Sequence, residues 1–114
     1  MKTERSNKES YKHYSAKNVL AEWLTGDYLR VDIESPFCME GTVLFVPDIS
    51  CYDEKGLSCI WEVEHKSGVT GLKLGMIQYY QHASGHYFPV YEISADYILR
   101  QTSKPKKILK CQMT

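Results

Sequence analysis

Two short acidic motifs lie at the ends of apolar, strand-like runs. Pro47-Asp48 follows the run at 43–46, and Glu62-Val63-Glu64-His65-Lys66 extends the run at 57–61. Side chains alternate faces along a strand, so Glu62, Glu64 and Lys66 are expected to share one face. Neighbouring carboxylates that are taken out of water repel each other unless a cation accompanies them.

A divalent metal ion would supply that cation. Mg²⁺ takes oxygen ligands and usually binds only one or two protein carboxylates. If the chain brings Asp48 alongside Glu62, these two residues are predicted to hold the metal. The next charged group along the strand would then handle an attacking water molecule, so the pattern predicts hydrolysis.

Length and composition favour one small globular domain spanning residues 1–114, with a basic tail at about 103–114. The hydrophobic content is 43%, the charged content is 25% and the formal net charge is zero. These proportions are typical of a water-soluble domain. A net charge of zero neither favours nor opposes nucleic-acid binding, because a basic groove can coexist with an acidic back.

The four cysteines are scattered without CxxC spacing, which argues against a zinc site. No signal peptide is recognisable, so reduced thiols and a cytoplasmic location are expected. No apolar stretch approaches the length of a transmembrane helix, and no membrane partner is predicted.

Hydrophobic periodicity predicts the order α-β-β-β-α-β-α. The expected helices cover residues 8–24, 72–83 and 95–101, and the expected strands cover 28–34, 42–48, 57–65 and 87–93. The spacing Ser6-Asn7-Lys8-Glu9 predicts a capping box for the first helix. Short connections predict an antiparallel meander for the first three strands, and a helical crossover predicts that the fourth pairs parallel to the third. The expected fold is an α/β sandwich with a mixed, four-stranded sheet.

This arrangement resembles the PD-(D/E)xK nuclease superfamily over residues 10–100. A closer resemblance is to the nuclease domain of the competence protein CoiA. The corresponding pieces here are His13 and Lys17 on the first helix, Pro47-Asp48, Trp61-Glu62-Val63-Glu64, and Lys73 on the second helix. The resemblance implies a restriction-endonuclease-like fold and cleavage of DNA phosphodiester bonds that depends on Mg²⁺ or Mn²⁺.

Two registers of the acidic motif are possible. In the first, Glu62-Val63-Glu64 is the motif and Glu64 stands where the family usually has lysine. In the second, Glu64-His65-Lys66 is an ordinary ExK motif. Placement favours the first register, because Glu62 lies inside the apolar run whereas Lys66 lies where the strand ends. Asp48 and Glu62 would hold the metal, with the Val63 carbonyl as a further candidate ligand, and Glu64 or Lys66 would position or deprotonate the water.

Basic residues outside the motif are candidates for nucleic-acid contact. His13 and Lys17 lie one turn apart at the edge of the apolar stripe of the first helix, and Lys73 lies beside the stripe of the second. Glu34, on the polar face of the first strand, is a further candidate acidic ligand. So small an enzyme would need a homodimer or a higher oligomer to reach both strands of a duplex. Two alternatives stay open: a nuclease fold that binds without cleaving, and a structural adaptor whose acidic strand end pairs with another protein.

Overall fold

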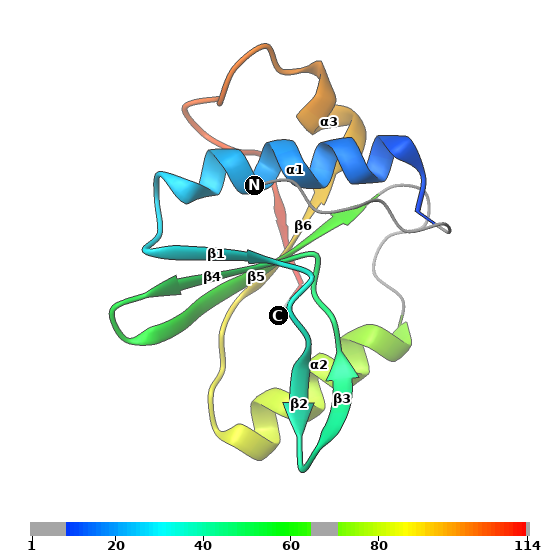
Figure 1. Ribbon diagram of the computed structural model, residues 1–114, viewed down its shortest axis with the longest axis vertical. Helices are drawn as coiled ribbons and strands as arrows, with labels where there is room; N and C mark the ends of the chain where they lie inside the picture. Colours follow the sequence, from blue (N-terminus) through cyan, green and yellow to red (C-terminus); the bar gives the residue numbers. More distant parts are fainter. Residues whose placement is uncertain (1–8, 65–70, 114) are drawn as a thin grey trace.

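The computed structural model describes residues 9–64 and 71–113 and is a mixed α/β fold, as the sequence predicts (Figure 1). Its elements, in chain order, are α1 (Tyr11–Thr25), β1 (Arg30–Ile33), β2 (Phe37–Met39), β3 (Thr42–Phe45), β4 (Ile49–Asp53), β5 (Gly56–Glu64), α2 (Gly71–Ser84), β6 (Val90–Ser94), α3 (Ala95–Arg100) and β7 (Cys111–Gln112). None of the described helices has the length and apolar character needed to cross a bilayer.

The main sheet is mixed and has five strands in the order β1-β4-β5-β6-β7. Strands β1, β4 and β5 pair antiparallel in that order, and β6 pairs parallel to β5 after the α2 crossover, as expected. The expected count of four strands is wrong, because β7 adds an antiparallel strand beside β6. Only two residues of the polar, lysine-rich tail form β7, and so short a strand has no alternating pattern to reveal it.

The second strand is expected at residues 42–48. Its first part, Thr42–Phe45, is a strand, but it ends earlier than expected and does not join the main sheet. Thr42–Phe45 pairs with Phe37–Met39 in a separate two-stranded hairpin, and the central strand of the meander is Ile49–Asp53. The hairpin forms locally because Glu40 and Gly41 both have positive φ angles, 51° and 80°. Two such residues make the tight turn that joins antiparallel strands. The prediction extended the apolar run at 43–46 through Pro47-Asp48, whereas residues 46–48 lie between β3 and β4.

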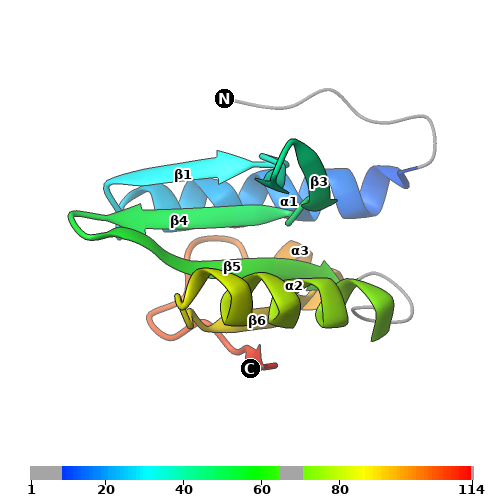
Figure 2. The same ribbon diagram turned by 90° about the horizontal axis from the view of Figure 1, so that it is seen from below.

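The helices cover both faces of the sheet (Figures 1 and 2). Helices α1 and α3 pack on one face, and α2 lies on the other beside the β2–β3 hairpin. Strand β5 serves both cores because its side chains alternate: Trp61 and Val63 face the α1 core, and Ile60 faces the α2 core. The sequence predicts this alternation correctly.

Helix α1 begins three residues later than expected. Ser10 is its N-cap, and the Ser10 hydroxyl accepts a hydrogen bond from the backbone N–H of His13 at 3.1 Å. The predicted capping box starts at Ser6, which lies outside the described residues. Ser94 caps α3 as expected, through a hydrogen bond from the Tyr97 N–H.

Candidate functional site

Asp48 and Glu62 meet where β4 begins and β5 ends. The two strands are antiparallel neighbours, so residues 14 apart in the sequence lie side by side in the sheet. The backbone N–H of Asp48 donates to Glu62 Oε2 at 2.8 Å. In return, the Val63 N–H donates to Asp48 Oδ2 at 2.8 Å. These two bonds fix both carboxylates at the rim of the sheet.

Basic side chains from both layers of helices reach the same carboxylates. His13 Nε2, from α1, lies 3.0 Å from the Val63 carbonyl oxygen and 3.3 Å from Asp48 Oδ2. Lys73, from the first turn of α2, forms an ion pair with Glu62 Oε1. The structure therefore brings together five of the residues predicted for the site, and it pairs each predicted acidic ligand with a cation.

A second group of charges lies behind His13. The Lys17 side chain is completely buried, and its Nζ donates to Glu9 Oε2 at 2.6 Å and to Glu34 Oε1. Glu9 Oε2 also lies 2.5 Å from His13 Nδ1. The two carboxylates hold this ammonium inside the fold. The contact between Lys17 and nucleic acid stays a prediction.

Glu9 was not among the predicted site residues. The available signal was the spacing Glu9, His13 and Lys17, because residues four apart lie on one face of the helix expected from residue 8. In the structure Glu9 precedes the N-cap Ser10 but still reaches both side chains. Glu9 Oε1 is buried and has no hydrogen-bond partner among the described residues.

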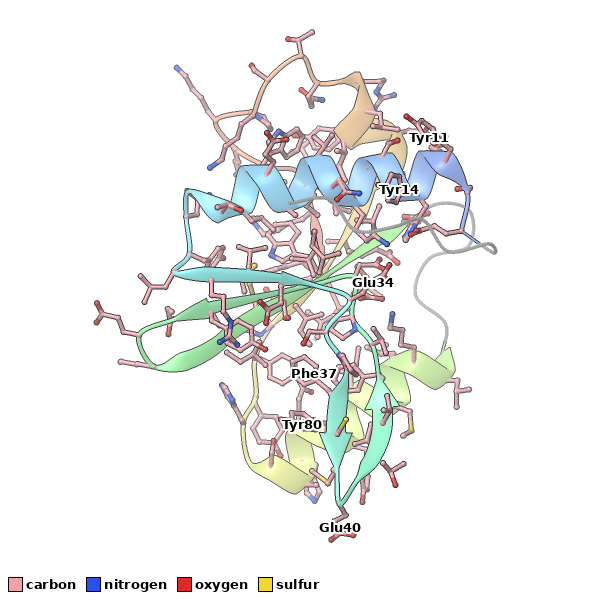
Figure 3. The ribbon with its side chains drawn as sticks, in the orientation of Figure 1. Tyr11, Tyr14, Glu34, Phe37, Glu40 and Tyr80 are labelled. Carbon is pink, nitrogen blue, oxygen red and sulfur yellow. The ribbon has the colours of Figure 1, made fainter. Side chains whose placement is uncertain are left out.

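Glu34 enters this group through an unusual backbone conformation. It follows β1 with a φ angle of 53°, in the left-handed region, and its N–H donates to the Asp48 carbonyl oxygen at 3.0 Å (Figure 3). A side chain at this φ angle costs some conformational strain. The left-handed conformation moves the Glu34 side chain away from the face that the alternation of β1 would give it, so that its carboxylate reaches Lys17.

The surroundings raise the pKa values of Glu62 and His13 and lower the pKa of Asp48. Burial and the neighbouring charge of Asp48 raise the pKa of Glu62 to about 7. Burial also opposes ionisation of Asp48, but the hydrogen bond and charge of His13 outweigh it and hold the pKa of Asp48 below its usual range. The hydrogen bond to Asp48, helped by Glu9, raises the pKa of His13 to about 9 against the effect of burial. Near pH 7 the site therefore contains a charged His13–Asp48 pair and a Glu62 that is close to its midpoint.

Protonated His13 is expected to stabilise the fold at low pH. Its pKa is about 9 when folded, against about 6.5 when unfolded, so the contribution is complete below pH 6.5 and is lost as the pH rises through 9. We expect wild type to exceed His13→Gln in free energy of unfolding by at most about 3 kcal/mol at pH 6, and by much less at pH 9.5. Urea denaturation at the two pH values, with a chelator present, measures both differences in free energy of unfolding. A difference that stays constant across this range would contradict the assignment.

The oxygen atoms of the site fit a hard divalent metal. Two carboxylates from neighbouring strands and one main-chain carbonyl are donors that Mg²⁺ accepts. Burial and repulsion from Asp48 raise the pKa of Glu62, and a bound dication would favour the charged form against both. Within residues 9–64 and 71–113, no group of three or more His, Cys, Asp or Glu side chains is arranged to hold a metal ion. The candidate ligand set is smaller than such a group, since one of its three donors belongs to the backbone.

The remaining predicted residues lie at the end of β5. Glu64 is the last residue of the strand, is half-buried, and pairs in register with Ser94 of β6. It shares the face of Glu62 and Ile60, as the alternation of β5 requires. His65 and Lys66 lie outside the described residues, so the choice between the two registers of the motif stays open.

Comparisons with protein-family models, with curated proteins and with solved structures found no match to this chain. The resemblance of the motifs to the nuclease superfamily stays a prediction.

Proposed function

We propose that this protein hydrolyses DNA phosphodiester bonds with the help of Mg²⁺ or Mn²⁺. The observation that supports the proposal is the buried contact between Asp48 and Glu62, whose carboxylates are held together by backbone hydrogen bonds of 2.8 Å across β4 and β5. Keeping two acids together out of water raises the pKa of one of them to about 7. Burying two acids together lowers the stability of the fold, and proteins typically keep such an arrangement where it serves a function.

Each residue has a distinct role in this proposal. Asp48, Glu62 and the Val63 carbonyl would hold the metal, which when bound would neutralise charge on the phosphate and lower the pKa of water. Glu64 or Lys66 would position or deprotonate the attacking water. His13 and Lys73 are partly exposed, so their side chains can turn from the carboxylates toward a phosphate of the DNA backbone.

A second candidate function is a nuclease-like module that binds DNA or a protein without cleaving. The observation in its favour is that the acids are already neutralised: His13 pairs with Asp48, and Lys73 pairs with Glu62. Buried carboxylates with cationic partners need no metal to be stable. The two candidate functions differ in whether a metal displaces these partners.

Titration of the purified chain with Mn²⁺ in a calorimeter separates the two candidates. The nuclease proposal expects a binding isotherm that Asp48→Asn removes, and nicking or cutting of supercoiled, linear or branched DNA when Mg²⁺ or Mn²⁺ is added. The silent module expects neither. Glu54→Gln is a matched control, because Glu54 is an exposed carboxylate in the turn between β4 and β5.

The two registers of the motif predict opposite effects for Lys66→Ala and Glu64→Gln. If Glu64 is the working group, Glu64→Gln should lower the cleavage rate by about a hundredfold or more, the usual range for a positioned acid or base. Lys66→Ala should then change the rate by less than about fivefold. If Lys66 is the working group, the order of the two effects reverses. Single-turnover cleavage of a labelled duplex measures both rates.

A further inference from the structure

The outer edge of β1 lacks a neighbouring strand. β1 stands first in the order of the five-stranded sheet, and none of the strands in the described part of the chain pairs with its outer side (Figure 2). The backbone groups of such an edge are a ready template for another strand.

The pairing of β1 with β4 shows which groups face outward. The Glu34 N–H donates to the Asp48 carbonyl, and Asp32 lies in register with Ser50. Alternate residues of a strand direct their backbone groups the same way, so Arg30 and Asp32 bond to β4. Val31 and Ile33 therefore present their N–H and C=O groups to the outer edge.

The edge borders an open groove of about 980 Å³ between β1 and α1. Tyr11 and Tyr14 of α1 line its far side, and Tyr11 is 69% exposed (Figure 3). Leu29, just before β1, is 72% exposed. The charged side chains of the groove lining are acidic, Glu22 and Asp32, so this surface repels nucleic acid and favours a protein partner.

We propose that the edge of β1 binds the same edge of a second copy of this chain. The two β1 strands would pair antiparallel about a twofold axis at Val31, joining two sheets into one. In this register, Arg30 of each chain lies opposite Asp32 of the other. The exposed Leu29 side chain lies near Ile33 at the end of the pairing, where the Leu29 N–H does not reach the partner because it donates to the Tyr52 carbonyl oxygen of its own chain at 3.0 Å. The pairing would bury an apolar residue and form two ion pairs between the chains.

Charge selects this register over its neighbours. A shift of two residues along the partner strand places Asp32 opposite Asp32. It also places Arg30 opposite Glu34, but the Glu34 carboxylate is already bound by Lys17. A shift of four places Asp32 opposite Glu34. Like charges directly opposite each other on a sheet are destabilising, whereas opposite charges are stabilising. Arg30 contacts Asp32 of its own chain at 3.3 Å and stacks over the Tyr52 ring at 3.9 Å. Its guanidinium is therefore already held on the face where the opposite Asp32 would lie.

This interface goes beyond the proposed function and does not depend on it. Association is measured without DNA or metal, so a failure of the dimer and a failure of the nuclease proposal are separately observable. The expected result for wild type is a mass that rises with concentration toward twice the 13.2 kDa of one chain, measured by sedimentation equilibrium.

Charge reversal tests the register. Arg30→Asp or Asp32→Arg alone replaces two attractive pairs by two repulsive ones, because the twofold axis doubles each change. Each is expected to raise the dimer dissociation constant by about tenfold or more. Lys106→Asp, a charge reversal at an exposed residue of the tail, is the control and should leave it unchanged. Circular dichroism checks that every variant is folded.

Two combinations should restore association. The double variant Arg30→Asp with Asp32→Arg exchanges the charges and should return the dissociation constant to within about threefold of wild type. An equimolar mixture of the two single variants should form a heterodimer. Wild type that stays monomeric at high concentration, or a double variant as weak as the singles, would overturn the proposal. Binding only to an unrelated basic peptide or to nucleic acid at this edge would also overturn it.

Discussion

Cleavage of DNA is expected to fall by about a thousandfold or more when Asp48 is replaced by Asn or Glu62 by Gln. A metal held by these carboxylates supplies several kcal/mol of transition-state stabilisation, and each 1.4 kcal/mol is a factor of about ten in rate. Neither amide carries the negative charge that a dication requires. The measurement is the single-turnover rate on a labelled duplex with saturating Mn²⁺.

The two substitutions are chosen so that the fold survives. In Asp48→Asn, the side-chain amide oxygen can still accept the 2.8 Å hydrogen bond that the Val63 N–H makes to Asp48. Gln in place of Glu62 resembles the protonated acid, whose pKa is raised to about 7, so the neutral form is already populated near neutrality. We therefore expect Glu62→Gln to be as stable as wild type at pH 8, or more stable.

Glu54→Gln serves as the control, since it removes an exposed carboxylate far from any described contact of the site. Activity that persists in both Asp48→Asn and Glu62→Gln would remove the proposed metal site. Loss of activity accompanied by loss of the folded state would be read as a structural effect, which urea denaturation of each variant detects.

Removing the buried ammonium of Lys17 is expected to lower the free energy of unfolding by about 3 kcal/mol or more. Breaking a buried ion pair typically costs about 3–5 kcal/mol, because the partner stays charged and desolvated. The lower end of this range applies here, since Glu9 keeps its contact with His13 and the Glu34 side chain is 39% exposed. Lys17→Met keeps most of the volume of the side chain while removing its charge, so the loss reports on Glu9 and Glu34 rather than on a cavity. For a domain with a total stability of about 5–15 kcal/mol, the loss is a large fraction.

The same helix offers a matched control. Lys12, which is 39% exposed, forms an ion pair with Asp96 at the surface, and Lys12→Met should cost less than about 1 kcal/mol. Adding Glu9→Gln to Lys17→Met removes one of the two carboxylates that Lys17 would otherwise neutralise, and should recover part of the lost free energy of unfolding. A loss below about 1 kcal/mol for Lys17→Met, together with weaker DNA binding, would instead favour a direct contact between Lys17 and a phosphate.

The sequence alone determined the elements whose signal is local. The alternation along residues 57–64 predicts that Ile60, Glu62 and Glu64 share a face, and the structure places Ile60 and Glu62 on the α2 side. The apolar spacing of 72–83 predicts α2, and Ser94 marks the start of α3. These signals depend on residues only a few positions apart, so the periodicity of a single segment is sufficient to read them.

The tertiary structure decided which strands pair and which charges meet. The turn of the β2–β3 hairpin is local, but its separation from the main sheet is decided by β1 pairing with Ile49–Asp53. The late strand Cys111–Gln112 depends on β6, a neighbour that no local pattern indicates. His13 reaches Asp48 across 35 residues of sequence, and Lys17 reaches Glu34 across 17.

Composition shows that acids and bases are present in equal number, but a buried carboxylate is stabilised only by the cation that lies within hydrogen-bonding distance. The order of strands and the layers of helices set that distance. For this reason the sequence predicts Asp48, Glu62, His13 and Lys73 as site residues, whereas only the folded chain shows that His13 pairs with Asp48 and Lys73 with Glu62.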